Sequence, residues 1–265
     1  MAGECTDNVK TPEHAGCDFV AATGSYLGRM TAPWLGIPPP SSTTFVTIRY
    51  GEFYLIRDGK ITLTFIIFDV PNLMLQCDVW NFPQVGNGSE IFIPGPKTND
   101  GVCPEAPPSC PKESAKSLDL VEGMLFACKK YDQKNLESMG MEAYWHPQML
   151  WYGPTGIGST FGVDGFQQGH QGPFLKAFPD REGGNHKARF ADGVYVASTG
   201  WPSMYATHKG SGWLGVDATE KSITMRVMDW WRRDGDSLRE NWVFIDIPEL
   251  LKQMGRDVLP YVSKG

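Results

Sequence analysis

The sequence lacks the features that mark several large classes of protein. None of its apolar runs approaches the roughly 18 residues of a transmembrane helix. Its first residues do not join a basic segment to an apolar one, as a signal peptide would. We therefore expect a cytoplasmic protein with no membrane partner. A formal net charge of −6 leaves no surplus of Lys and Arg, so nucleic acid is not an expected partner either.

Two kinds of bound group are also not indicated. The cysteine and histidine residues do not have the spacing of a zinc site, so no metal is predicted. The glycine-rich stretch at 153–158 lacks the Gly-Lys-Ser/Thr ending of a phosphate-binding loop, so it is not interpreted as one. The six cysteines are an even number, but without an export signal we interpret them as reduced thiols.

What the chain does have is an internal repeat. The segment Asp69–Leu73 returns as Asp246–Leu250 at a shift of 177 residues, and Val20–Gly24 returns as Val196–Gly200 at a shift of 176. This period is far too long for a solenoid repeat, so it indicates a duplicated domain. With 265 residues, 41% of them apolar and 12% aromatic, the chain can build the cores of two modules.

The two copies differ in what precedes their strands. We expect strands at about 18–80 and again at about 192–247, with helices near 114–130, 133–139 and 163–178. This predicts three parts: a truncated, mostly sheet-forming first module at 1–81, a proline-rich linker at 82–113 and a complete module at 114–265. An uncovered first sheet would expose an apolar face. We therefore expect the second module or another chain to cover it.

Each copy ends in an aspartate set among apolar residues, and two roles are open for it. Asp246 could be a general acid or base whose pKa is raised by burial. Alternatively, because it precedes Ile247-Pro248, it could cap a helix and bind the amide of residue 248 or 249. The same choice applies to Asp69 before Val70-Pro71.

A hairpin turn near Asp234-Gly235 predicts which side chains share a face of the sheet. Simple antiparallel pairing sets Asp229 opposite Trp242, so that Asp229 and Trp231 share a face with Trp242 and Asp246. In the first copy Glu52 and Asp69 take the corresponding positions. We expect this face to line a pocket.

These residues resemble a known family. The stretch with Thr207-His208-Lys209-Gly210, Trp213-Leu214-Gly215, Glu240-Asn241-Trp242 and finally Asp246 is similar to the SnoaL-like polyketide (ester) cyclases of the nuclear transport factor 2-like superfamily. The resemblance covers roughly 115–258 well and 18–80 more weakly. It implies an α+β cone, in which helices close a curved antiparallel sheet around an apolar pocket, and dimers that form through the sheet. It also implies a cofactor-free aldol cyclisation with Asp246 as the proton shuttle. The family's Glu-His-Trp is Glu240-Asn241-Trp242 here, so one titratable group is missing.

The helical half supplies further candidates. His170 is the second catalytic candidate, and with Tyr152 it could line the mouth of the cone. Trp151, His146 and His208 are candidate substrate contacts, as are Asp229, Trp231 and Trp242. For each of them core packing or a structural hydrogen bond is the competing interpretation.

The sequence thus predicts an acid–base enzyme that cyclises or isomerises a small or medium carbonyl compound or ester. Hydrolysis by an Asp-activated water in the same pocket is one alternative, and a non-catalytic binding or assembly module is another. The expected partners are an apolar or oxygenated small molecule and a second module, as a homodimer or as an internal pseudo-dimer.

Overall fold

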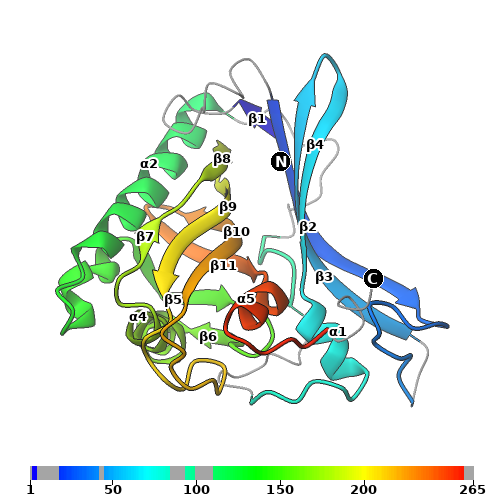
Figure 1. Ribbon diagram of the computed structural model, residues 1–265. Coiled ribbons are helices and arrows are strands. Elements are labelled where there is room, and N and C mark those ends of the chain that lie inside the picture. Colours follow the sequence, from blue (N-terminus) through cyan, green and yellow to red (C-terminus); the bar gives the residue numbers. More distant parts are fainter. Residues whose placement is uncertain (1, 5–17, 42–44, 84–92, 99–109, 260–265) are drawn as a thin grey trace.

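The described residues fold into two sheets, with one long helix, α2 (Pro111–Ala127), beside the second sheet and shorter helices elsewhere (Figure 1). The computed structural model describes residues 2–4, 18–41, 45–83, 93–98 and 110–259. The first part contains strands β1 (Ala2–Glu4), β2 (Asp18–Arg29), β3 (Phe45–Arg57) and β4 (Lys60–Phe68) and helix α1 (Val70–Gln76). The second begins with helix α2 (Pro111–Ala127) and the short helices η2 (Cys128–Lys130), η3 (Leu136–Met139) and η4 (Met141–Ala143). It continues with β5 (Trp145–Tyr152), β6 (Ser159–Phe161), α3 (Gly162–Phe166), the π-helix η5 (Gln167–Gln171), α4 (Gly172–Ala177), β7 (Glu182–Gly183), β8 (His186–Asp192), β9 (Tyr195–Thr207), β10 (Ser222–Asp234), β11 (Ser237–Ile245) and α5 (Ile247–Gln253).

The fold class is the α+β class expected. The first sheet has the strand order β1-β2-β3-β4, and the second has the order β6-β5-β11-β10-β9-β7, with β8 also paired to β9. All strand pairs are antiparallel except β11 with β5, which is parallel. The second sheet curves strongly, and α2 covers its inner face (Figure 1). Among the described residues, no helix has both the length and the apolar composition needed to cross a membrane.

The two copies share fine structural detail. Asp69 and Asp246 cap α1 and α5 with nearly the same backbone angles, φ −76° and ψ 71° against φ −72° and ψ 75°. Gln76 bonds the backbone N–H and C=O of Thr47, and Gln253 does the same with Thr224. These parallels support the duplication inferred from the sequence, while the module boundaries stay a prediction.

The first sheet is covered on one face by the second module, as expected for a sheet with an apolar face. Its side chains Phe19, Phe53 and Phe65 pack with Trp230 and Phe244 of the second sheet into one buried cluster. The ring of Phe53 lies 5.1 Å from that of Trp230. The two sheets therefore form a face-to-face pair within one chain (Figure 1).

A buried polar cluster also joins the modules. The carboxylate of Asp69 accepts hydrogen bonds from Arg49, from the backbone N–H of Asn72 (3.1 Å) and from the N–H of Thr155 (3.1 Å). Arg49 and Asn72 also donate to the Thr155 hydroxyl, at 2.8 and 3.2 Å. Thr155 belongs to the loop after β5, so the capping aspartate of the first module holds a loop of the second.

The linker and the cysteines are described in part. Pro94 accepts a hydrogen bond from Nε1 of Trp242 (3.1 Å), so this section of the linker lies against the outer face of the second sheet. Cys77, Cys110 and Cys128 are free thiols. Cys5, Cys17 and Cys103 lie outside the described residues.

Candidate active site

A β-bulge decides which side chains enter the cone. Arg232 pairs with Glu240 while Arg233 pairs with Leu238, so Arg239 is an extra residue on β11. The first hairpin has the same irregularity, between Leu55 and Ile56 of β3. One extra residue moves every later side chain of a strand to the other face relative to its partner.

The bulge makes the expected arrangement of the faces wrong. Asp229 lies opposite Val243, and Trp242 lies opposite Trp230. Asp229 and Trp231 therefore face the inside of the cone. Trp242 instead packs in the cluster between the two sheets and does not share a face with Asp229.

The inner face brings together a small polar group around Asp229. Ser198 of β9 is its neighbour on one side, and Arg189 of β8 pairs with Ser198 in turn. Nε of Arg189 donates to the Ser198 hydroxyl at 3.3 Å, and Nη1 lies 3.8 Å from Oε1 of Glu122 on α2. Asn241 follows on β11 beside Trp231, with its amide donating to the Trp230 carbonyl at 3.0 Å.

Burial raises the pKa of the Asp229 carboxyl group. Desolvation raises the pKa of Asp229 to about 7, although a hydrogen bond from Asn241 and the charge of Arg189 both act to lower it. Burial also lowers the pKa of Arg189, which the nearby acids Glu122 and Asp229 partly offset. At neutral pH Asp229 can therefore either donate or accept a proton.

The first module has an acid in the same place but in other surroundings. Glu52 accepts hydrogen bonds from the hydroxyls of Tyr26 (3.0 Å) and Tyr54 (2.5 Å). The hydrogen bond to Glu52 is the largest of the effects that raise the pKa of Tyr26 and of Tyr54. Tyr26 is 47% exposed, so this acid lies under a tyrosine on an open sheet face.

His170 and Trp151 meet at the helical wall of the cone. Their rings stack with centroids 4.1 Å apart. Desolvation lowers the pKa of His170 to about 3, so the imidazole is neutral at pH 7. His170 lies in the π-helix η5, a distortion that often marks functional sites.

Several buried polar atoms near this wall have no hydrogen-bond partner within the described part of the chain. They are Nδ1 of His170, Oγ1 of Thr160, Nε2 of Gln167, Oε1 of Gln171 and, on the sheet, Nε1 of Trp231. Buried polar groups normally bond to something. The polar groups of a ligand could fill this role.

Tyr152 is not at the cone mouth, which corrects the expected placement. It lies beside Trp242 on the outer face, with ring centroids 5.5 Å apart. Desolvation, together with the neighbouring Glu240, raises its pKa to about 12. Tyr152 and Trp242 therefore contribute to the interface between the sheets rather than to the inner face.

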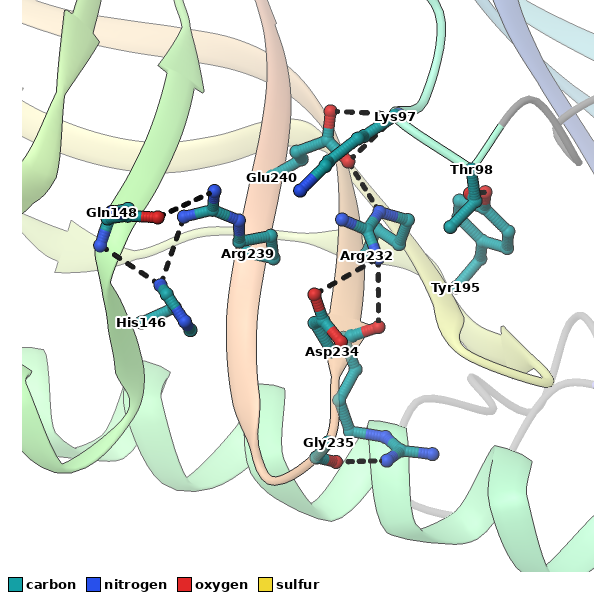
Figure 2. A network of polar contacts seen from close by, with 11 residues as sticks. Lys97, Thr98, His146, Gln148, Tyr195, Arg232, Asp234, Gly235, Arg239 and Glu240 are labelled. Atoms are coloured by element: carbon teal, nitrogen blue, oxygen red, sulfur yellow. Dashed lines mark hydrogen bonds and ion pairs between the residues drawn. The ribbon is translucent and has the colours of Figure 1, made fainter.

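His146 is held at the bulge on the outer side of the second sheet (Figure 2). Its Nδ1 lies 3.0 Å from Nη1 of Arg239 and accepts a hydrogen bond from the backbone N–H of Gln148, also at 3.0 Å. Nearby, the backbone N–H of Lys97 lies 3.3 Å from both carboxylate oxygens of Glu240. These contacts anchor the linker and β5 and do not bring His146 to Asp229.

His208 and Asp246 also lie apart from Asp229. His208 is fully buried at the end of β9, where its Nδ1 lies 3.1 Å from the hydroxyl of Thr219. Asp246 accepts a hydrogen bond from the Glu249 N–H at 3.3 Å and pairs with Nη1 of Arg226 at 3.1 Å. The Glu249 contact is the one that the capping interpretation specified, and the ion pair with Arg226 is an additional contact.

Sequence reasoning missed Arg189, Ser198 and Glu122. Arg189 and Ser198 were signalled only by the alternation of β8 and β9, and Glu122 only by its place on α2. Neither pattern shows that Ser198 and Arg189 lie beside Asp229 or that Glu122 lies beside Arg189. Asn241 was noticed only as a replacement for histidine. The structure puts it beside the acid, where its amide can donate.

Comparisons with known proteins match one part of the chain. Residues 128–254 match the model of the SnoaL-like polyketide cyclases. This part of the chain is similar to that family. The match spans just under half of the 265 residues and contains Asp229, Asn241 and Asp246. No curated protein matches the chain.

Solved structures resemble the chain over about half its length. IdmH, a candidate polyketide cyclase from Streptomyces antibioticus, is 20% identical with a TM-score of 0.42, over 52% of this chain and 98% of its own. A candidate SnoaL-like polyketide cyclase from Jannaschia sp. CCS1 is 11% identical with a TM-score of 0.47, over 56% and 97%. AclR, a candidate hydroxylase from Streptomyces galilaeus, is 24% identical with a TM-score of 0.40, over 54% and 82%.

Proposed function

We propose that the second module is a cofactor-independent acid–base enzyme. Its substrate is a small or medium carbonyl compound or ester, which it cyclises or isomerises. The observation that carries this proposal is Asp229, a desolvated acid with a pKa raised to about 7 on the inner face of a SnoaL-like cone. A general acid–base group works best when its pKa is near the operating pH.

The inner face supplies the parts that this chemistry needs. The Asp229 carboxylate removes a proton from the carbon beside a carbonyl, and negative charge develops on the carbonyl oxygen. Arg189 and the amide of Asn241 are the nearby groups able to stabilise that charge. The carbanion then attacks a second carbonyl of the same molecule, and protonated Asp229 returns its proton to the new alkoxide. In an isomerisation, the proton returns instead to another carbon.

This assignment moves the proton-transfer role from Asp246 to Asp229. The oxygens of Asp246 bind the Glu249 amide and Arg226, so both already have a structural partner. Its counterpart Asp69 makes the same kinds of contact in the first module. The repeat therefore supports a capping role for both.

Proton–deuterium exchange on model substrates tests the proposal. A panel of β-keto esters and polyketone mimics is incubated in D₂O with the wild type, Asp229→Asn or Asp246→Asn, and loss of the α-proton is followed by NMR. We expect exchange to be catalysed by the wild type, to fall at least about 100-fold in Asp229→Asn, and to persist in folded Asp246→Asn. The reverse ranking would return the role to Asp246.

Hydrolysis is the second candidate, because Asn241 stands beside Asp229 and its amide could help hold a water for attack. The same panel in H₂¹⁸O separates the two reactions. Label in an acid product would favour hydrolysis, and exchange without label would favour cyclisation or isomerisation. Binding without exchange or label would favour the non-catalytic alternative.

A further inference from the structure

Strand β4 forms an open edge of the first sheet. It pairs with β3 on one side, and no other strand of the described residues pairs with its far side. The β3–β4 hairpin reaches the top of Figure 1, on the side of the molecule away from α4 and α5. Within the described part of the chain, its outer backbone groups therefore have no strand to pair with.

The repeat allows the edge of β4 to be compared with the equivalent edge in the second module. The counterpart of β4 is β11, which pairs with β10 on one side and with β5 on the other. The β5 contacts of β11 run from Leu238 to Trp242. At the repeat shift of 177, those positions correspond to Ile61–Phe65 of β4. The same edge thus holds a strand in the second module, whereas in the first no described strand occupies it.

Lys60 and the bulge at Thr62 protect only the start of this edge. From Ile61 to Phe68 the strand reads Ile-Thr-Leu-Thr-Phe-Ile-Ile-Phe, without a charge, a proline or a glycine. Ile61, Leu63 and Ile66 are 61%, 41% and 39% exposed. Edge strands of monomeric proteins usually carry Lys, Pro or inward charges that prevent pairing. This strand has the composition of a strand that pairs.

We propose that β4 pairs with β4 of a second copy of this chain, antiparallel about a twofold axis at Phe65. The two four-stranded sheets then join into one of eight strands. In this register Thr64 lies opposite Ile66 of the other copy, and Leu63 lies opposite Ile67. The bulge at Thr62 stays outside the paired segment.

A second copy fits this edge better than a charged partner does. The paired segment is neutral, so two copies bring no like charges together. The outer face of the second sheet is already covered by the first sheet and by residue Pro94. Pairing along the edge of β4 leaves these contacts of the outer face intact. About five residues a side bury less than a standard interface, so we expect dissociation in the micromolar range.

Two paired variants test the register. Thr64→Lys/Ile66→Lys would put two lysines opposite each other at each of two places, whereas Thr64→Lys/Ile66→Glu would put opposite charges there. Light scattering during gel filtration at high micromolar concentration should give twice 29.4 kDa for the wild type and for the Lys/Glu variant. It should give 29.4 kDa for the Lys/Lys variant. Leu27→Lys changes a side chain that is 72% exposed in the same sheet but off this edge, and it should remain dimeric.

Hydrogen exchange supplies the second measurement. Amides in 63–67 should become more protected as the wild-type concentration rises, and those of β2 should not. A monomeric wild type, a dimer that survives the Lys/Lys change, or a dimer without added protection in β4 would overturn the proposal.

Discussion

The buried contacts of Asp69 predict a large loss of stability on Asp69→Ala. The side chain of Asp69 is 1% exposed and that of its partner Arg49 is 4% exposed. Nε and Nη1 of Arg49 already lack a partner among the described residues. Removing the carboxylate would leave a buried guanidinium without its counter-charge, which typically costs about 3–5 kcal/mol. The same change also removes the cap of α1 and the bond to the Thr155 N–H.

The repeat supplies a matched control in Asp246→Ala. This aspartate has the same cap geometry, but its ion pair with Arg226 is more accessible, with side chains 25% and 34% exposed. Loss of a cap costs about 0.5–2 kcal/mol, and a solvent-accessible ion pair adds little. We therefore expect Asp69→Ala to lower the free energy of unfolding by about 2 kcal/mol or more beyond the loss caused by Asp246→Ala.

Urea unfolding at pH 7 measures the difference. Tryptophan fluorescence and far-ultraviolet circular dichroism should be recorded together, because coincident transitions support a single free energy of unfolding. Equal losses in the two variants would refute the reasoning, since they would show that the buried pair and the Thr155 contact add nothing to the cap.

The packing and the protonation states lead to three further predictions. A Cβ on Gly51 would lie 2.8 Å from the Trp230 ring, so Gly51→Ala should cost about 1–3 kcal/mol, whereas Gly28→Ala, with no atom within 4 Å, should not destabilise. The pKa of His170 is lowered to about 3, so its ring signals should not titrate between pH 5 and 8 in an NMR experiment, and a transition near pH 6.5 would contradict its burial. Because the pKa of Asp229 is raised, the folded state binds more protons than the unfolded state between about pH 4 and 7. The stability of the wild type relative to Asp229→Asn should therefore fall as pH rises through this range, by at most about 1.4 kcal/mol per pH unit. A stability difference that does not change with pH in urea unfolding would contradict this prediction.

Sequence reasoning worked where the interactions are local. An aspartate followed by an apolar residue and proline predicts a helix start, because the cap bond spans only three residues, and α1 and α5 begin in this way. The stretch expected at 114–130 is occupied by α2 and η2. The segment 163–178 forms α3, η5 and α4.

It failed where a contact joins distant parts of the chain. The extra residue of the bulge, Arg239, binds His146, which is 93 residues away, and nothing in β10 or β11 indicates that partner. Missing one residue reversed the faces and placed Trp242 in the pocket. Strand β5 was missed for the same reason, since its parallel pairing with β11 depends on a neighbour about 90 positions later in the sequence.

The titration of the Asp229 carboxyl tests the central claim most directly. Carboxyl-selective NMR on the wild type, with Asp229→Asn to assign the signal, gives its pKa in the folded protein. The account predicts a midpoint near 7, as expected of a desolvated acid that exchanges protons with a substrate at neutral pH. A midpoint near the ordinary value of 3.8 would show a fully ionised, solvated carboxylate and would contradict the assignment of Asp229 as the acid–base group.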